Sequence, residues 1–97
     1  ILDKNVRRII GLLINDINEE NESVIHLIYI DKKYQGKGIG TQILEEQLQI
    51  DKENNRNTIL RVFKENPARF LYQRLGFEIY GETEFHYLMR RVLKKES

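Results

Sequence analysis

The stretch Tyr34-Gln35-Gly36-Lys37-Gly38-Ile39-Gly40-Thr41 decides the fold, because it connects a strand-like run to the start of a helical pattern. Upstream, Ser23 to Asp31 is rich in β-branched residues, which is typical of a strand. Downstream, apolar residues recur at the spacing of an amphipathic helix, at Ile39, Ile43, Leu44 and Leu48. The chain therefore passes from strand to helix through a loop that contains three glycines.

This loop has the composition of an anion-binding turn. Glycines let a chain turn tightly and let its N–H groups approach a ligand, and a helix start adds unpaired donors and a partial positive charge. Such a loop can hold phosphates, although a plain glycine-rich turn is the alternative. A nucleotide P-loop fits worse, because Lys37 precedes the last glycines. A dinucleotide fingerprint also fits poorly, because the glycine spacing differs and no acidic strand end follows.

Working outward toward the N-terminus, Arg8 to Asn18 is a second strand-like run that ends in the turn-forming residues 18–21. With Ser23 to Asp31 it predicts an antiparallel hairpin. A turn at Asp3-Lys4-Asn5 would add Ile1-Leu2 as a further strand. Because Ile1-Leu2 resembles the end of an apolar run, we expect a fragment or a processed product.

Toward the C-terminus, the helical pattern fades in residues 51–57, and Thr58 to Phe63 reads as a strand parallel to the one before the helix. A shorter helix follows, with Asn66 as N-cap, Pro67 at the first helical position and Gly76 after the end. A closing hairpin is predicted from residues 77–80 and 85–92, although residues 87–89 could also begin a short helix.

The composition limits the function classes. A chain of 97 residues, 40% hydrophobic and 32% charged, is long enough for a single domain over residues 1–97. The absence of cysteine excludes a Cys nucleophile and a thiolate metal site, and it suits a protein of the reducing cytoplasm. Because two histidines alone make a poor zinc site, we expect no bound metal. We expect no membrane association, since no apolar run could span a bilayer. Because the net charge is +1, the pairs Arg90-Arg91 and Lys94-Lys95 are weak support for nucleic-acid binding, which we do not expect.

Two segments together resemble one family. Residues 35–40 are similar to the acetyl-coenzyme A loop of the GNAT superfamily of N-acetyltransferases, and Asn66 to Phe77 resembles a second signature of that family. The resemblance implies an α/β (α+β) fold: a mixed, mostly antiparallel sheet with two flanking helices, whose parallel strands, ending here near Ile30 and Phe63, are splayed. It also implies that a strand and two helices precede Ile1 in a full domain, of which this chain is the C-terminal two-thirds.

The resemblance further implies that acetyl-coenzyme A is the cosubstrate. Its pantetheine arm would contact the main chain of Ile28, Tyr29 and Ile30, and its pyrophosphate would bind the loop. That loop comprises Gln35, Gly36, Lys37, Gly38, Ile39, Gly40 and Thr41. Asn66 would hydrogen-bond the pantetheine, unless it is a helix cap alone. Lys33, Lys37 and Arg69 are candidate phosphate ligands, whereas Lys32 and Lys64 read as surface charge.

Three residues are candidates for catalysis by resemblance. Tyr72 stands at the family's tyrosine and would protonate the leaving thiolate, unless it is a packing residue. The N–H of Ile28 would stabilise the oxyanion. Family members often have a Glu as base where Val24 stands, and His26, which we expect on the same strand face as Val24, Ile28 and Ile30, is the alternative base.

The sequence thus predicts an N-acetyltransferase that acts by direct attack of a primary amine in a ternary complex, since no covalent nucleophile is evident. A non-catalytic coenzyme A binding or protein-interaction module is the alternative. Lesser candidates for acceptor recognition lie in the closing hairpin, at Glu82, Glu84, His86 and Tyr87. The acceptor stays open among protein lysines, protein N-termini, polyamines and aminoglycosides, and an incomplete sheet edge near Ile1 leaves a homodimer open.

Overall fold

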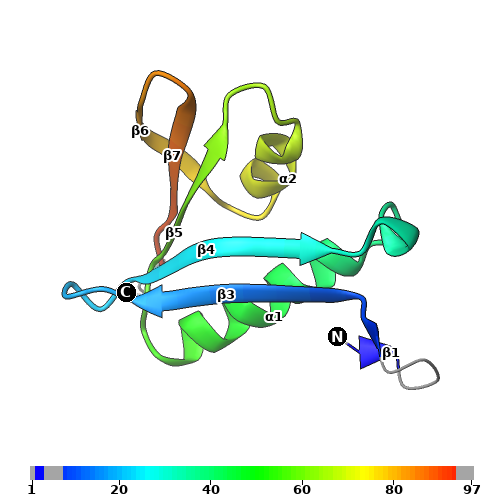
Figure 1. Ribbon diagram of the computed structural model, residues 1–97. Helices are drawn as coiled ribbons and strands as arrows, with labels where there is room; N and C mark the ends of the chain where they lie inside the picture. The colour runs from blue at the N-terminus through cyan, green and yellow to red at the C-terminus, as the bar shows by residue number, and fades with distance from the viewer. Residues whose placement is uncertain (1, 4–7, 94–97) are drawn as a thin grey trace.

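The computed structural model describes residues 2–3 and 8–93. A five-stranded sheet has the order β3-β4-β5-β7-β6, and two short strands, β1 and β2, form a separate antiparallel pair (Figure 1). The strands are β1 (Leu2–Asp3), β2 (Arg8–Ile9), β3 (Gly11–Ile17), β4 (Ser23–Ile30), β5 (Thr58–Phe63), β6 (Glu78–Glu82) and β7 (His86–Arg91). The helices are the 3-10 turn η1 (Lys32–Tyr34), α1 (Ile39–Glu53) and α2 (Ala68–Arg74).

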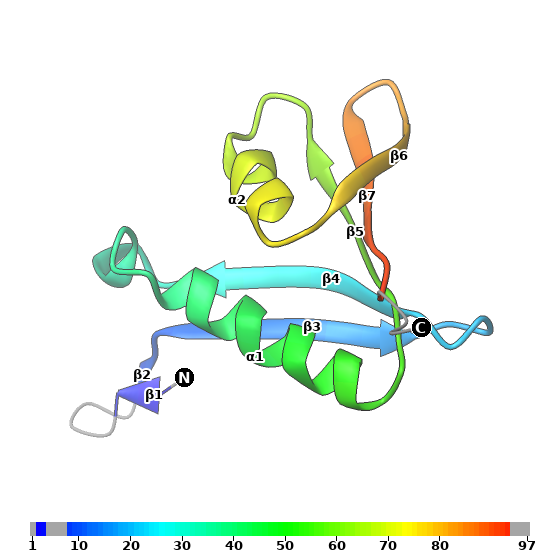
Figure 2. The same cartoon turned by 180° about the vertical axis from the view of Figure 1, so that it is seen from behind.

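The main sheet is mixed, as predicted. Strands β3 and β4 form the expected antiparallel hairpin, β5 pairs with β7 and β7 with β6 in antiparallel fashion, and β4 pairs with β5 in parallel. The parallel pairing consists of Ser23 with Thr58 and Val24 with Ile59, after which the strands separate. Figures 1 and 2 show β4 and β5 meeting at one end and diverging toward α2. The predicted fold class, with its splayed parallel pair and two helices, is confirmed.

Helix α1 forms because its apolar residues share one face, and this face packs on β3 and β4. The central apolar cluster joins this helix to both halves of the sheet and to Phe77, between α2 and β6. Its buried members are Ile25, Leu44, Leu48, Leu60, Val62, Phe77 and Met89. The core therefore holds β4 and β5 on one scaffold, although the strands pair at only one end.

Hydrogen bonds between polar side chains stabilise the region where β4 and β5 pair. Asp51, at the end of α1, is buried and accepts a hydrogen bond of 2.8 Å from the hydroxyl of Thr58. Ser23 is buried as well and accepts a bond of 2.9 Å from the Asn15 amide. Helix α1 ends at Glu53, within the stretch 51–57 where the apolar pattern fades.

The structure divides one predicted strand in two and excludes one alternative in the closing hairpin, whose prediction is confirmed. The run from Arg8 to Asn18 is two strands, because the chain leaves the small sheet at Ile10, which is buried, and enters the main sheet at Gly11. Residues 87–89 are strand and not helix, because β7 pairs with both β5 and β6. The turn predicted at Asp3-Lys4-Asn5 and the pair Lys94-Lys95 lie wholly or partly outside the described residues.

The β3–β4 hairpin contains a β-bulge. Ile14 pairs with Leu27, and the next residue of β3, Asn15, pairs with Ile25. His26 is therefore an extra residue on β4 with no partner of its own. A bulge of this kind shifts the alternation of side chains by one residue.

The shift changes where His26 points. Ile25, before the bulge, and Ile28, after it, both pack against the core, although they are three residues apart. Ile30 also lies on the core side, near Gly40 of α1. The prediction that His26 shares a face with Ile28 and Ile30 is therefore wrong, and His26 is exposed.

Candidate functional site

The fork is the point where β4 and β5 separate, after the pairs Ser23–Thr58 and Val24–Ile59. Beyond the fork, the main chain of β4 has no described strand beside it on the side of β5. The N–H of Asp31 donates to the carbonyl of Ile10 at 2.8 Å, on the side of β3. Main-chain groups alternate in direction along an antiparallel ladder, so Tyr29 also faces β3, whereas Ile28 and Ile30 face the gap. Backbone donors and acceptors in such a position need partners. One is supplied by Gln35, whose amide donates to the carbonyl of Ile30 at 3.2 Å.

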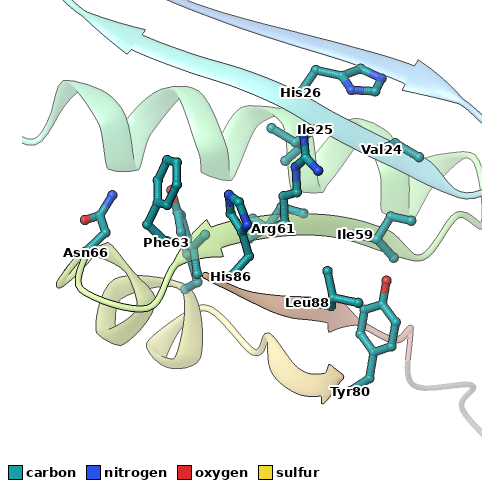
Figure 3. A pocket seen from close by; sticks show the side chains of 13 residues that line it. Val24, Ile25, His26, Ile59, Arg61, Phe63, Asn66, Tyr80, His86 and Leu88 are labelled. Atoms are coloured by element: carbon teal, nitrogen blue, oxygen red, sulfur yellow. The ribbon is translucent and has the colours of Figure 1, made fainter. Parts of the chain in front are cut away.

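Two cavities occupy the gap. The larger, of about 640 Å³, lies between β4 and the strands β5, β6 and β7 (Figure 3), and Asn66 and Tyr72 also border it. The smaller, of about 90 Å³, is bordered by Ile28, Leu27 and Tyr72. Five residues border both cavities: Ile25, His26, Leu60, Arg61 and Tyr72. The structure thus brings Tyr72, Ile28 and His26, the three predicted catalytic residues, to one place.

Tyr72 is half-buried between the sheet and α2. Its ring packs against Phe77 with the centroids 5.9 Å apart. Burial raises the pKa of the Tyr72 phenol above its usual value of 10.0, because the charged phenolate would lose solvation. Tyr72 is therefore a protonated O–H donor at the edge of both cavities, and it also packs against the core.

The glycine-rich loop continues from η1 into α1. Gly36 and Gly38 have φ values of 77° and 78°, in the left-handed region that favours glycine. An added Cβ would meet nothing within 4 Å at either position, so both face open space. Gly38 precedes α1 without a side-chain cap, which leaves the first N–H groups of the helix available to an anion.

The sequence profile described as "Acetyltransferase (GNAT) domain" matches residues 1–79. The chain belongs to the GNAT acetyltransferase family. A curated relative, the spermine/spermidine N(1)-acetyltransferase of Bacillus subtilis (strain 168), is 34% identical over 82 residues, which cover 81% of this chain and 53% of the relative. The chain thus spans about half the length of that relative.

Solved structures of the GNAT fold agree with the architecture. PH1933 of Pyrococcus horikoshii OT3 has a TM-score of 0.79 at 28% identity, covering 89% of this chain and 59% of that one. The PaiA N-acetyltransferase of Thermoplasma acidophilum, solved in complex with coenzyme A, has a TM-score of 0.76, covering 87% of this chain and 54% of that one. At 24% identity the second likeness bears on the fold alone.

Helix α2 begins at Ala68, one residue later than predicted, and Asn66 lies just before Pro67 at its start. Its side-chain oxygen accepts a hydrogen bond of 2.9 Å from the N–H of Ala68, which is the bond of an N-cap. Asn66 also lines the larger cavity. The cap therefore uses the oxygen, and the amide nitrogen can still donate to a ligand.

The candidate phosphate ligands lie in different settings. Lys37 is exposed, with its Nζ 5.6 Å from the ring centre of Tyr34. Lys33 is exposed in η1. Arg69 lies on α2, where its guanidinium stacks on Phe70 at 4.7 Å and on Tyr87 at 5.2 Å. Lys37 is thus the one of the three that lies within the glycine loop.

The four candidates for acceptor recognition in the closing hairpin lie in different environments. His86 lines the larger cavity and stacks on Phe63 with ring centroids 4.3 Å apart. Glu82 forms an ion pair of 2.7 Å with Lys64, so Lys64 is not an unpaired surface charge. Tyr87 packs against the core, and Glu84 is exposed outside the cavity lining.

Sequence reasoning missed the side chains of β5 that face the larger cavity. Leu60 and Val62 are buried in the core, so Ile59, Arg61 and Phe63 point to the other face. This alternation is visible in the sequence, and the parallel strand assignment could have placed these residues beside the gap.

The described part of the chain contains neither a metal-binding group of side chains nor a membrane-spanning helix. No group of three or more His, Asp or Glu side chains there could hold a metal ion. No helix formed by those residues is long and apolar enough to cross a membrane.

Proposed function

We propose that the chain is an N-acetyltransferase that moves the acetyl group of acetyl-coenzyme A to a primary amine by direct attack in a ternary complex. The observation that carries this proposal is the opening between β4 and β5, where Ile28 and Tyr72 border one small cavity. Membership of the GNAT family supports acetyl-coenzyme A as the cosubstrate.

The cosubstrate would lie along the open edge of β4. Its pantetheine amides would pair with the main chain of Ile28 and Ile30, while Tyr29 supports the site through its pairing with β3. Its pyrophosphate would accept hydrogen bonds from the loop that runs from Gln35 to Thr41, with Lys37 close by. Binding would displace the Gln35 amide from the carbonyl of Ile30.

The chemical step needs a neutral amine, an oxyanion donor and an acid for the thiolate. The amine nitrogen attacks the thioester carbonyl carbon, forming the C–N bond, and the developing oxyanion accepts a hydrogen bond from Ile28. As the C–S bond breaks, Tyr72 gives its proton to the sulfur. The proton lost by the nitrogen goes through water to His26, which is exposed and borders both cavities.

An amine-panel assay on the full chain tests this proposal. The full chain is incubated with acetyl-coenzyme A, and free thiol is measured in the presence of amino acids, peptides, aminoglycosides and polyamines; the last are included because a relative is described as a spermine/spermidine acetyltransferase. Amine-dependent thiol release supports the proposal. Binding of coenzyme A without transfer to any amine would instead indicate the non-catalytic module.

A further inference from the structure

We infer that Arg61 selects the acceptor, and that the acceptor is a small primary amine bearing a carboxylate. The inference rests on the proposed function and narrows it to a substrate class. It starts from the position of Arg61, which is exposed on β5 two residues beyond the last parallel pair and lines the larger cavity. Figure 3 shows the Arg61 side chain extending from β5 toward β4.

Arg61 reaches the place where the proposed transfer occurs. It borders both cavities, together with Tyr72 and His26. On β5 it is two residues beyond Ile59, which pairs with Val24, so it lies at the level of His26 on β4. An anion held by Arg61 would therefore lie close to the proposed acid and base.

The guanidinium of Arg61 has no carboxylate partner among the described residues. It forms no hydrogen bond or ion pair with any of them. Of the described residues that line the two cavities, Arg61 is the one Asp, Glu, Lys or Arg side chain. Glu82, on the neighbouring hairpin, is held by Lys64 at 2.7 Å. The described cavity is thus positively charged at Arg61.

The phosphates of the cosubstrate are too distant to be the partner of Arg61. The glycine loop begins beyond Ile30, four residues after His26 along β4. At a rise of about 3.3 Å per residue this separation is roughly 13 Å. Since the pyrophosphate is assigned to the loop, an anion bound at Arg61 would belong to the acceptor.

A guanidinium binds a carboxylate through two parallel hydrogen bonds, which fixes both distance and orientation. A single positive charge matches the single negative charge of a carboxylate. His26 and His86 supply further ring nitrogens to the same cavity. A diamine would instead bring a second ammonium toward Arg61, and like charges at this range repel.

The test compares three ligands of equal chain length: 4-aminobutanoate, its neutral amide 4-aminobutanamide, and 1,4-diaminobutane. Binding of each is measured by calorimetry on the full chain, with and without saturating coenzyme A, and acetylation of each is measured in parallel. The variants are Arg61→Glu and Arg61→Gln. Arg74→Gln is the matched control, because Arg74 is exposed on α2 and does not line either cavity.

We expect the parent to bind the amino acid at least tenfold more tightly than the diamine, with the amide between them. Arg61→Glu should reverse the order, Arg61→Gln should abolish the preference, and Arg74→Gln should keep it. Coenzyme A affinity should be the same in all four proteins, which also shows that the variants are folded. The inference is overturned if the parent prefers the diamine or if Arg61→Glu keeps the parental order. Failure of coenzyme A to bind the parent would instead contradict the proposed function.

Discussion

At the scale of single residues, the site depends on groups whose chemistry is set by their surroundings. The phenol of Tyr72 is protonated at neutral pH, and burial raises its pKa further, because the phenolate would be poorly solvated where α2 packs on the sheet. Gly36 and Gly38 hold left-handed conformations that other residues adopt at a cost. The sequence predicts a proton-donating tyrosine and a tight glycine turn. The structure adds the burial of Tyr72 and the left-handed conformations of the two glycines.

Replacement of Tyr72 by Phe tests the proposed acid. Packing against Phe77 is retained, so coenzyme A affinity should barely change, while kcat falls by about ten- to a thousandfold, within the scale of general acid catalysis. The deficit should shrink as the pH approaches the thiol pKa of about 8.5, because the thiolate then needs less help. A pH series of kcat measures this, and parental kcat throughout would make Tyr72 a packing residue.

The same residue predicts how stability depends on pH. Because the pKa of Tyr72 is higher in the folded than in the unfolded chain, its contribution is complete below about 10 and is lost as pH rises through the folded pKa. Urea unfolding between pH 8 and 11 should therefore show a steeper alkaline loss in the parent than in Tyr72→Phe. Equal slopes would argue against a raised pKa.

Gly38→Glu should abolish coenzyme A binding, because it places a negative charge where the pyrophosphate is expected. It also puts a side chain at a φ of 78°, which costs about 1 to 2 kcal/mol of stability. Gly38→Asn is the control, since Asn tolerates this conformation and adds no charge. Calorimetry with coenzyme A should show loss in the first variant and retention in the second; parental affinity in Gly38→Glu would contradict the loop assignment.

At the scale of elements, the start of α2 contributes both to the stability of the helix and to the lining of the larger cavity. Its N-cap, Asn66, uses the side-chain oxygen to hold the Ala68 N–H and leaves the amide nitrogen at the edge of the cavity. One residue can thus start the helix and bind a ligand, because the two tasks use different atoms.

Two variants of Asn66 separate these tasks. Asn66→Ala removes the cap and should lower the free energy of unfolding by about 1 kcal/mol. Asn66→Asp keeps the accepting oxygen, so stability should be close to parental, but it loses the donating nitrogen and should weaken coenzyme A binding. Denaturant unfolding and calorimetry measure the two effects. Parental coenzyme A affinity in Asn66→Asp would limit Asn66 to the helix cap.

The elements also show what a sequence can and cannot predict here. The strands of the main sheet, helices α1 and α2 and the parallel crossover followed from apolar periodicity and from the glycine and proline positions, whereas the break between β2 and β3 did not. The bulge at His26 could not be foreseen, because it depends on how β3 and β4 fit together and not on either strand alone. Similarly, the ion pair between Lys64, in the turn after β5, and Glu82, at the end of β6, joins residues far apart in the sequence and leaves no local signal.

At the scale of the whole molecule, the fold is two arms joined at a fork. One arm is β3, β4 and α1, and the other is β5, β6, β7 and α2 (Figure 2). A ligand in the opening would contact both arms, and this is how the proposed cosubstrate site arises. A homodimer and a cytoplasmic location stay predictions.

Because the proposed site needs both arms in place, coenzyme A should stabilise the folded chain. At a ligand concentration a hundredfold above Kd, the gain in unfolding free energy is about 2.7 kcal/mol. Thermal melts of the parent with and without coenzyme A measure the shift, with Gly38→Glu as the control that should not respond. An unchanged Tm of the parent at millimolar coenzyme A would count against the site.

The central claim is that coenzyme A pairs with the open edge of β4, and residue-resolved amide hydrogen exchange tests it most directly. In the free chain, the amides of Ile28 and Ile30 should exchange quickly, whereas Tyr29 should be protected by its pairing with β3. Addition of coenzyme A should slow exchange at Ile28 and Ile30 and leave Tyr29 nearly unchanged. Unaltered exchange at Ile28 and Ile30 in the saturated complex would contradict the account.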